Sequence, residues 1–120
     1  KRQIGQKYTK SLSDIKGVQL PVERPWSRQV YWMYGILLDK SHEMTASELA
    51  DYLSDVGIQT RPFFLGMHSQ PALQNLGLFQ NEHYPVADHL SQNGLYLPSG
   101  LALSEKQMDE VCAAVHNILT

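Results

Sequence analysis

The chain has 120 residues, of which 42% are hydrophobic and 18% are charged, and its formal net charge is -2. This length and composition predict one globular domain with a single modest core, and they argue against a disordered, fibrous or two-domain chain. The ten lysines and arginines form no basic run, which argues against nucleic acid or a membrane surface as the partner.

The first segments of the chain predict a helix followed by two strands. Apolar residues at helical spacing predict a helix over residues 1–15, with Gly17 as the left-handed residue that ends it. Residues 18–20 predict a short extended segment. The aromatic and branched residues 30–38 predict a long strand at the centre of the sheet, buried on much of both faces.

The middle of the chain predicts a second helix and a short strand. Residues 45–48 have the spacing of a reciprocal capping box, and the helix that they begin should end at Gly57. Its expected apolar stripe is Leu49, Tyr52, Leu53 and Val56. Residues 58–61 are a strand candidate, because Pro62 keeps the residue before it extended.

The last segments predict two more helices around a strand. Residues 70–76 predict a short helical turn, and Pro85 fits the first position of a helix that ends at Gly94. Residues 95–97 predict a strand, and a second capping box at 104–107 begins the final helix. Its apolar stripe is Met108, Val111, Cys112, Val115, Ile118 and Leu119. The whole order predicts an α+β fold, a small antiparallel or mixed sheet with helices packed on one face.

Residues 59–71 form the segment with the strongest functional signal. An irregular segment stiffened by two prolines carries Arg61, Phe63, Phe64 and His68, and such loops commonly line binding sites. Arg61 would bind phosphate or sugar oxygens, His68 a hydroxyl, and the two phenylalanines would form flat apolar walls. The alternative is structural: Arg61 pairs with a surface carboxylate, His68 caps a turn, and at least one phenylalanine is buried in the core.

Other residues invite a functional interpretation less strongly. The five histidines include no pair at helical i, i+4 spacing, so a metal site is not expected. Cys112 falls within an apolar stripe, which predicts core packing rather than nucleophilic catalysis. Because Cys112 is the only cysteine, no internal disulfide is possible, and a reducing cytoplasm is the default compartment. Tyr31, Trp32 and Tyr34 alternate along the expected central strand, which fits either two-sided burial or an interface with a missing domain or subunit.

Several runs together resemble a known family across essentially the whole chain. They are 57–64, 67–71, 84–87, 94–100 and 103–105. These runs look like the C-terminal small domain of DegT/DnrJ-type sugar-nucleotide aminotransferases, and Tyr31 to Gly35 with Arg61 to Phe64 look most like the perosamine synthetase branch. One departure is Gly66, which stands where many relatives carry proline.

The resemblance implies a pyridoxal 5'-phosphate enzyme of the aspartate-aminotransferase fold, working as a cytoplasmic homodimer in lipopolysaccharide O-antigen biosynthesis. Glutamate would be the amino donor, and a GDP-linked 4-keto-6-deoxy sugar the acceptor. The large domain, with the lysine that binds the cofactor, would lie upstream, so residues 1–120 would be one small domain that binds no cofactor alone and is inactive alone. Arg61 and His68, and secondarily Phe63 and Phe64, would lie beside the sugar nucleotide or the donor carboxylate, and no residue here would be catalytic.

Two alternatives stay open on the sequence alone. One is a sugar dehydratase of the same family, in which histidine replaces the upstream lysine. The other is a free-standing α+β module that binds a small ligand or a partner chain without catalysis. The second alternative predicts a start codon near Lys1 and a stable monomer, whereas the chain opens without methionine and inside a helical pattern, which favours a piece of a longer protein.

Overall fold

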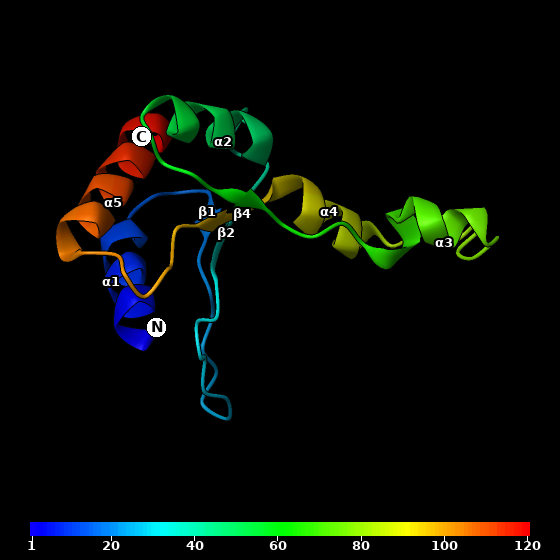
Figure 1. Cartoon of the computed structure of the whole chain (residues 1–120), viewed down its shortest axis with the longest axis horizontal. Helices are drawn as coiled ribbons and strands as arrows, with labels where there is room; N and C mark the ends of the chain where they lie inside the picture. The colour runs from blue at the N-terminus through cyan, green and yellow to red at the C-terminus, as the bar shows by residue number, and fades with distance from the viewer.

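The computed structural model describes residues 1–120 as a four-stranded antiparallel sheet with helices around it (Figure 1). The strand order is β1-β2-β4-β3. The helical elements are α1 (Arg2–Leu12), α2 (Ala46–Asp55), the 3-10 helix η1 (Met67–Ser69), α3 (Pro71–Asn75), α4 (Pro85–Asn93) and α5 (Glu105–Leu119). The strands are β1 (Val18–Gln19), β2 (Tyr34–Leu38), β3 (Arg61–Pro62) and β4 (Gly94–Leu97).

The core lies between one face of the sheet and the helices α1, α2 and α5, so the expected α+β layering is confirmed. Alternate residues of β2 and β4 point into it, because successive side chains of a strand face opposite sides. The seventeen core residues are Ile4, Tyr8, Leu12, Ile15, Tyr31, Tyr34, Ile36, Leu38, Ala46, Leu49, Leu53, Leu95, Leu97, Met108, Val111, Cys112 and Val115. Cys112 is a buried free thiol, as its place in the apolar stripe predicted.

Both expected capping boxes are present. Thr45 and Glu48 exchange side-chain and backbone hydrogen bonds at the start of α2, and Ser104 and Gln107 do the same at the start of α5. Gly57, with φ of 81°, ends α2, since its N–H and that of Ile58 bond back to Ser54 and Leu53. The expected stripe of α2 is only half right, because Leu49 and Leu53 are buried whereas Tyr52 and Val56 are exposed.

The first helix is shorter than expected. α1 ends at Leu12 rather than at residue 15, and Gly17 lies beyond it with φ of 73°. Gly17 instead lies in a turn before β1. Its carbonyl accepts a hydrogen bond from the Asp39 N–H at 2.9 Å, which brings β1 beside β2. A side chain at Gly17 would meet Ser41, His42 and Asp39, so this turn requires glycine.

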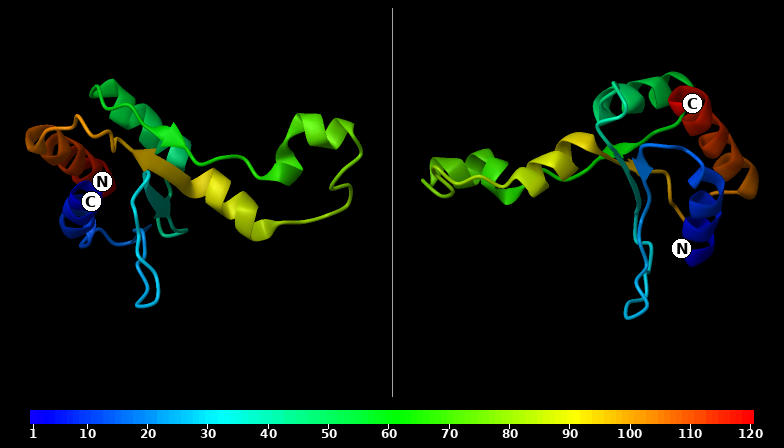
Figure 2. Two further views of the ribbon diagram at one scale, coloured as in Figure 1. Left: turned by 60° about the horizontal axis from the view of Figure 1, so that its bottom comes forward. Right: turned by 180° about the vertical axis from the view of Figure 1, so that it is seen from behind.

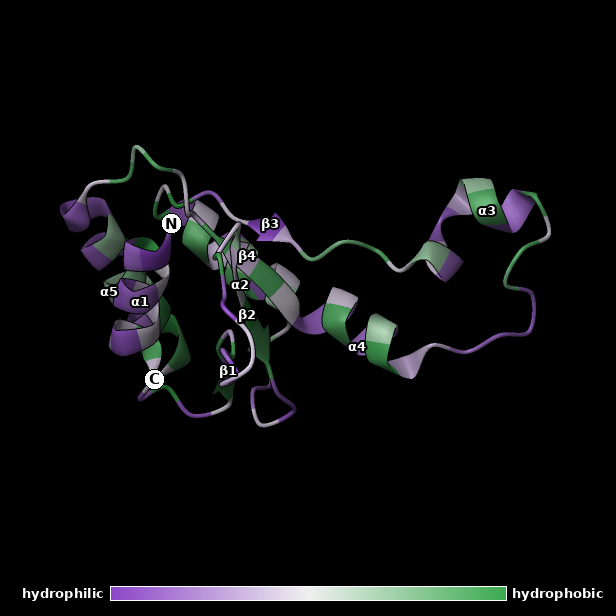
Figure 3. Cartoon of the chain, turned by 90° about the horizontal axis from the view of Figure 1, so that it is seen from below, coloured by the Kyte–Doolittle hydropathy of each residue, from purple (hydrophilic) through white to green (hydrophobic).

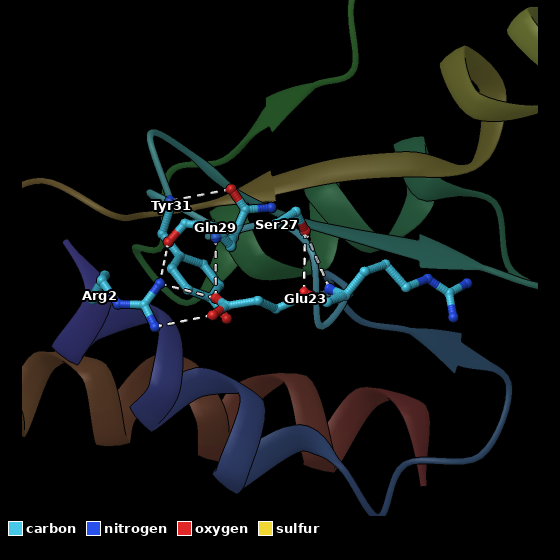
Figure 4. Close-up of polar contacts among 6 residues, drawn as sticks. Arg2, Glu23, Ser27, Gln29 and Tyr31 are labelled. Carbon is cyan, nitrogen blue, oxygen red and sulfur yellow. Dashed lines mark hydrogen bonds and ion pairs between the residues drawn. The ribbon is translucent and has the colours of Figure 1, made fainter.

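The expected long strand over residues 30–38 is wrong in its first half. β2 holds the centre of the sheet, as predicted, but begins only at Tyr34, and Tyr31 has φ of 50°. Figure 4 shows the cause: Arg2 of α1 pairs with Glu23 at 2.9 Å and also donates to the carbonyl of Gln29. These bonds hold residues 20–33 as a loop and turn the Tyr31 ring inward onto Gly5 of α1.

The strand expected at residues 58–61 is displaced toward the C-terminus. β3 begins at Arg61, since Ile58 donates its backbone N–H to Leu53 in the end of α2 and is not available for the sheet. The short turn α3, the helix α4 beginning at Pro85 and the strand β4 all form where the sequence predicted them.

Two segments project from the compact body. One is the loop of residues 20–33, and the other is the arm, residues 64–93, which carries η1, α3 and α4 (Figure 2). The radius of gyration is 15.7 Å, above the roughly 14 Å expected for a compact domain of this length. Hydrophobic residues occur even on α3 at the far end of the arm (Figure 3). None of the helices combines the length and apolar character required to span a membrane.

Candidate functional site

The candidate site lies at the β3 edge of the sheet, on the face turned away from the core. Leu95 and Leu97 of β4 point into the core, so Tyr96 between them points outward. Arg61 lies opposite Tyr96 in the antiparallel pairing of β3 and β4, and directly paired residues share a face of the sheet. The guanidinium of Arg61 and the ring of Tyr96 therefore extend from the same outer face.

Phe63 covers the neighbouring part of this face. Its ring stacks on Tyr96 with centroids 4.4 Å apart, and its Cζ would lie 2.7 Å from a Cβ built on Gly35. A side chain at Gly94 would also overlap the Phe63 ring. Gly35 of β2 and Gly94 of β4 thus leave a shallow seat for one aromatic ring, which makes Phe63 half-buried and structural as much as functional.

Phe64 stands free beside this stack. It is 67% exposed, and its centroid is 5.8 Å from that of Tyr96. Phe63, Phe64 and Tyr96 form what we call the aromatic edge. Tyr96 was missed by sequence reasoning, although strand alternation between Leu95 and Leu97 was enough to place it on the outer face.

Arg61 has no partner within the chain. It is exposed, and its side chain makes neither a hydrogen bond nor an ion pair, so the structural alternative, pairing with a surface carboxylate, is wrong. A guanidinium offers five donors in a planar fork that matches carboxylate and phosphate oxygens. Beside the aromatic edge, this arrangement can hold an anionic group while a flat ring stacks next to it.

His68 lies on the arm and is held by α4. Its Nε2 donates to Oδ1 of Asp88 at 2.6 Å, and its ring lies 4.8 Å from that of Tyr84. His68 therefore does not simply cap a turn; it ties η1 to α4. A hydrogen bond to Glu82 raises the pKa of the Tyr84 hydroxyl.

The structure does not bring all four expected residues into direct contact. Arg61, Phe63 and Phe64 surround Tyr96 at the sheet edge, whereas the side-chain contacts of His68 are with Asp88 and Tyr84 on the arm. The arm begins immediately after Phe63 and leads away from the sheet (Figure 2). A ligand that met both His68 and Arg61 would have to lie along the first residues of the arm.

Two hollows flank the aromatic edge, and Tyr96 lines both. The larger has a volume of about 550 Å³ and runs from Arg61 to Gln107 and Glu110 of α5. Its walls therefore carry the positive charge of Arg61 and the negative charge of Glu110. The smaller, about 310 Å³, lies over the outer face between the loop of residues 20–33 and α4, with Phe63 and Leu90 in its apolar lining. The larger falls within the range of small-molecule sites.

The lysines of the chain all lie at or near the surface. A Schiff-base lysine has to be desolvated in a pocket, but none of the six lysines is buried. The least exposed, Lys7, pairs with Asp109 at 2.7 Å, and the ion pair raises its pKa. The β3 edge, where the exposed Arg61 lies beside the rings of Phe64 and Tyr96, fits a ligand that carries an anion and a ring.

Comparison with known proteins identifies the chain's relatives. The family model described as the DegT/DnrJ/EryC1/StrS aminotransferase family matches residues 1–116. The chain therefore belongs to this family, and its α+β fold is shared by solved aminotransferases.

Two similar relatives share one name. The chain is 29% identical over 117 residues to a GDP-perosamine synthase of Vibrio cholerae, covering 98% of this chain and 31% of the relative. It is 31% identical over 116 residues to a GDP-perosamine synthase of Escherichia coli O157:H7, covering 97% and 30%. The crystal structure of the aminotransferase TlmJ from Streptoalloteichus hindustanus matches with a TM-score of 0.79 at 25% identity, covering 97% and 30%. The chain thus spans about a third of the length of the proteins that it matches.

Proposed function

We propose that the chain is the C-terminal small domain of a pyridoxal-phosphate-dependent aminotransferase that transfers an amino group from glutamate to a nucleotide-linked keto-deoxy sugar. The observation that carries this proposal is the match of nearly the whole chain to two relatives named GDP-perosamine synthase. A GDP-linked 4-keto-6-deoxy sugar is accordingly the proposed acceptor. When bound, pyridoxal phosphate supplies the electron sink for amino transfer, and in this proposal the upstream large domain holds it.

The role proposed for this chain is to bind substrate and close one side of the active site. Arg61 would bind a phosphate or a carboxylate through charge-assisted hydrogen bonds, which its lack of an internal partner supports. Phe64 and Tyr96 would offer rings for stacking, and Phe63 would hold Tyr96 in position. His68 would contact the sugar. None of these residues is proposed to move a proton.

Exposed apolar side chains support a missing neighbour. Trp26 is 85% exposed and Trp32 is 67% exposed, both on the loop of residues 20–33, and Leu65, Met67 and Leu76 are exposed along the arm. Isolated domains that have lost a partner commonly show such surfaces. We infer that the loop and the arm pack against the large domain or the second subunit of a cytoplasmic homodimer.

The alternative of a free-standing ligand-binding module makes a different prediction about the gene. Under the proposed function, the reading frame continues upstream of Lys1 through about two thirds of a protein and encodes a lysine in the family context. A start codon adjacent to Lys1 would favour the module instead. A histidine in place of that lysine would favour the sugar dehydratase.

The proposed role of Arg61 is tested by Arg61→Ala in the full-length enzyme, assayed with the GDP-linked keto sugar and glutamate. Loss of a charge-assisted contact worth about 1.5–3 kcal/mol should raise the KM of one substrate about 10- to 100-fold. Lys10→Ala is the control, because Lys10 of α1 is a likewise exposed cation whose side chain has no ion pair and lies outside the loop and the arm. Unchanged kinetics in Arg61→Ala would remove Arg61 from the site without touching the assignment of the reaction.

A further inference from the structure

The imidazole of His68 is held from one side only. Nε2 lies 2.6 Å from Oδ1 of Asp88, and a carboxylate can only accept, so Nε2 carries the proton of this bond. In a neutral imidazole the other ring nitrogen, Nδ1, is then a hydrogen-bond acceptor. Tyr84, with its centroid 4.8 Å from that of the imidazole, packs against the ring and limits its rotation.

Nδ1 of His68 has no partner within the chain and can be reached from outside. The only hydrogen bond of the side chain is the one to Asp88. No completely buried side-chain nitrogen or oxygen of the chain lacks a partner, so the unpartnered Nδ1 keeps some contact with solvent although only 14% of the side chain is exposed. The ring thus presents one acceptor atom from an otherwise enclosed position.

Gly66 borders the same edge of the ring. A Cβ at Gly66 would lie 2.7 Å from Nδ1 and closer still to Cε1, so any larger residue would displace the imidazole or cover Nδ1. The backbone of Gly66, with φ of -58° and ψ of 150°, is one that any residue adopts. A larger residue at position 66 would therefore conflict with the present position of the His68 ring, whereas the backbone conformation would admit it.

We propose that Nδ1 of His68 accepts a hydrogen bond from a hydroxyl group of the sugar. Asp88 is the positioning residue that fixes the tautomer, and Gly66 leaves Nδ1 uncovered. This inference rests on the proposed function and adds to it the atom, the direction of the hydrogen bond and two further residues. In the neutral imidazole Nδ1 accepts, so its partner must donate. A hydroxyl donates, whereas an ionised phosphate cannot, and the carboxylate of Asp88 on the other side of the ring disfavours an anion further.

The test uses the full-length enzyme with His68→Asn and His68→Gln. Asparagine keeps a polar group near the position of Nδ1, whereas glutamine keeps one near Nε2 and leaves the Nδ1 position empty. His68→Gln should raise the KM for the keto sugar nucleotide about tenfold, and His68→Asn at most about threefold, as one neutral hydrogen bond implies. The inhibition constant of GDP, which lacks the sugar, should stay the same in both.

Controls separate a binding role from a structural one. His83→Asn and His83→Gln lie on the same arm at an exposed histidine without a side-chain hydrogen bond, and both should match the parent enzyme. Gly66→Ala should raise the KM for the sugar nucleotide about tenfold and leave GDP inhibition unchanged. Its matched control is Gly100→Ala, since a Cβ at Gly100 meets nothing within 4 Å.

The outcomes decide between the two proposals. Suppose that the parent enzyme transaminates normally. If His68→Asn were then as impaired as His68→Gln, or if Gly66→Ala were unimpaired, the Nδ1 contact would be overturned and the proposed function would stand. A His68 variant that weakens GDP as much as the sugar nucleotide would also overturn it, since that pattern marks general damage to the arm. A parent enzyme without transaminase activity would instead refute the proposed function itself.

Discussion

At the scale of single residues, the candidate site depends on glycines, because their missing side chains leave room for the rings of other residues. Phe63 occupies the seat above Gly35 and Gly94, and only in that position does its ring stack on Tyr96 at 4.4 Å. The His68 ring occupies the space beside Gly66 in the same manner. In both cases the missing side chain of one residue determines where the functional ring of another residue lies.

Phe63 and Phe64 should therefore respond differently to the same substitution. Phe63→Ala would empty the seat on the sheet and should lower the free energy of unfolding by about 2–3 kcal/mol, below the usual cost for a fully buried ring. Phe64→Ala removes an exposed ring and should cost less than about 1 kcal/mol. Urea unfolding of both variants measures the difference, and equal costs would contradict the assigned packing of Phe63.

At the scale of elements, helix caps and turns determine where each segment begins and ends. α2 and α5 begin with the same reciprocal box, but the third helical residue is Glu48 in one and Gln107 in the other. Only the first can titrate. Hydrogen bonds from the backbone N–H and the hydroxyl of Thr45 lower the pKa of Glu48 below its usual value of 4.5.

A lowered pKa in the folded state means that the ionised form stabilises the fold. This contribution is present above the usual pKa of Glu48 and is lost as pH falls through the lowered value. Glu48→Gln should therefore reduce the free energy of unfolding at pH 7, and the deficit should shrink between about pH 5 and pH 3.

The matched control lies in the second box. Ser104→Ala should cost about 1 kcal/mol at every pH in this range, since its partner Gln107 does not titrate. Urea unfolding at several pH values compares the two. A deficit of Glu48→Gln that stayed constant with pH would show that the charge of Glu48 does not contribute to the cap.

At the scale of the whole molecule, the shape indicates a surface built for contact. The loop of residues 20–33 and the arm project from the body (Figures 1 and 3), and both carry exposed apolar side chains. The ion pair of Arg2 with Glu23 attaches the base of that loop to α1 and so fixes the direction in which the loop projects.

The two tryptophans of the chain report on this surface. In the 120-residue chain, acrylamide should quench both Trp26 and Trp32 efficiently, because both are largely exposed. In the full-length enzyme we expect the loop to be covered and both to be protected. The fluorescence removed by Trp26→Phe or Trp32→Phe isolates each signal, and equal quenching in the two proteins would argue against the loop as an interface.

The amino-acid sequence by itself determined the local features of this protein. Caps at Thr45 and Ser104, the turn at Gly57, the helix start at Pro85 and the apolar stripe of α5 follow from propensities and spacings within a few residues. The same local pattern identified Arg61, Phe63, Phe64 and His68 as candidates, and these site assignments stay predictions.

Only the tertiary structure decided where those side chains meet. The strand expected from residue 30 begins at Tyr34 because Arg2, far away in the sequence, holds the preceding loop through Glu23 and Gln29. Tyr96 beside Arg61, Phe63 above two glycines and Asp88 behind His68 are likewise contacts between distant segments. Such contacts depend on how the strands pair and how the arm folds back, and periodicity along one segment carries no information about either.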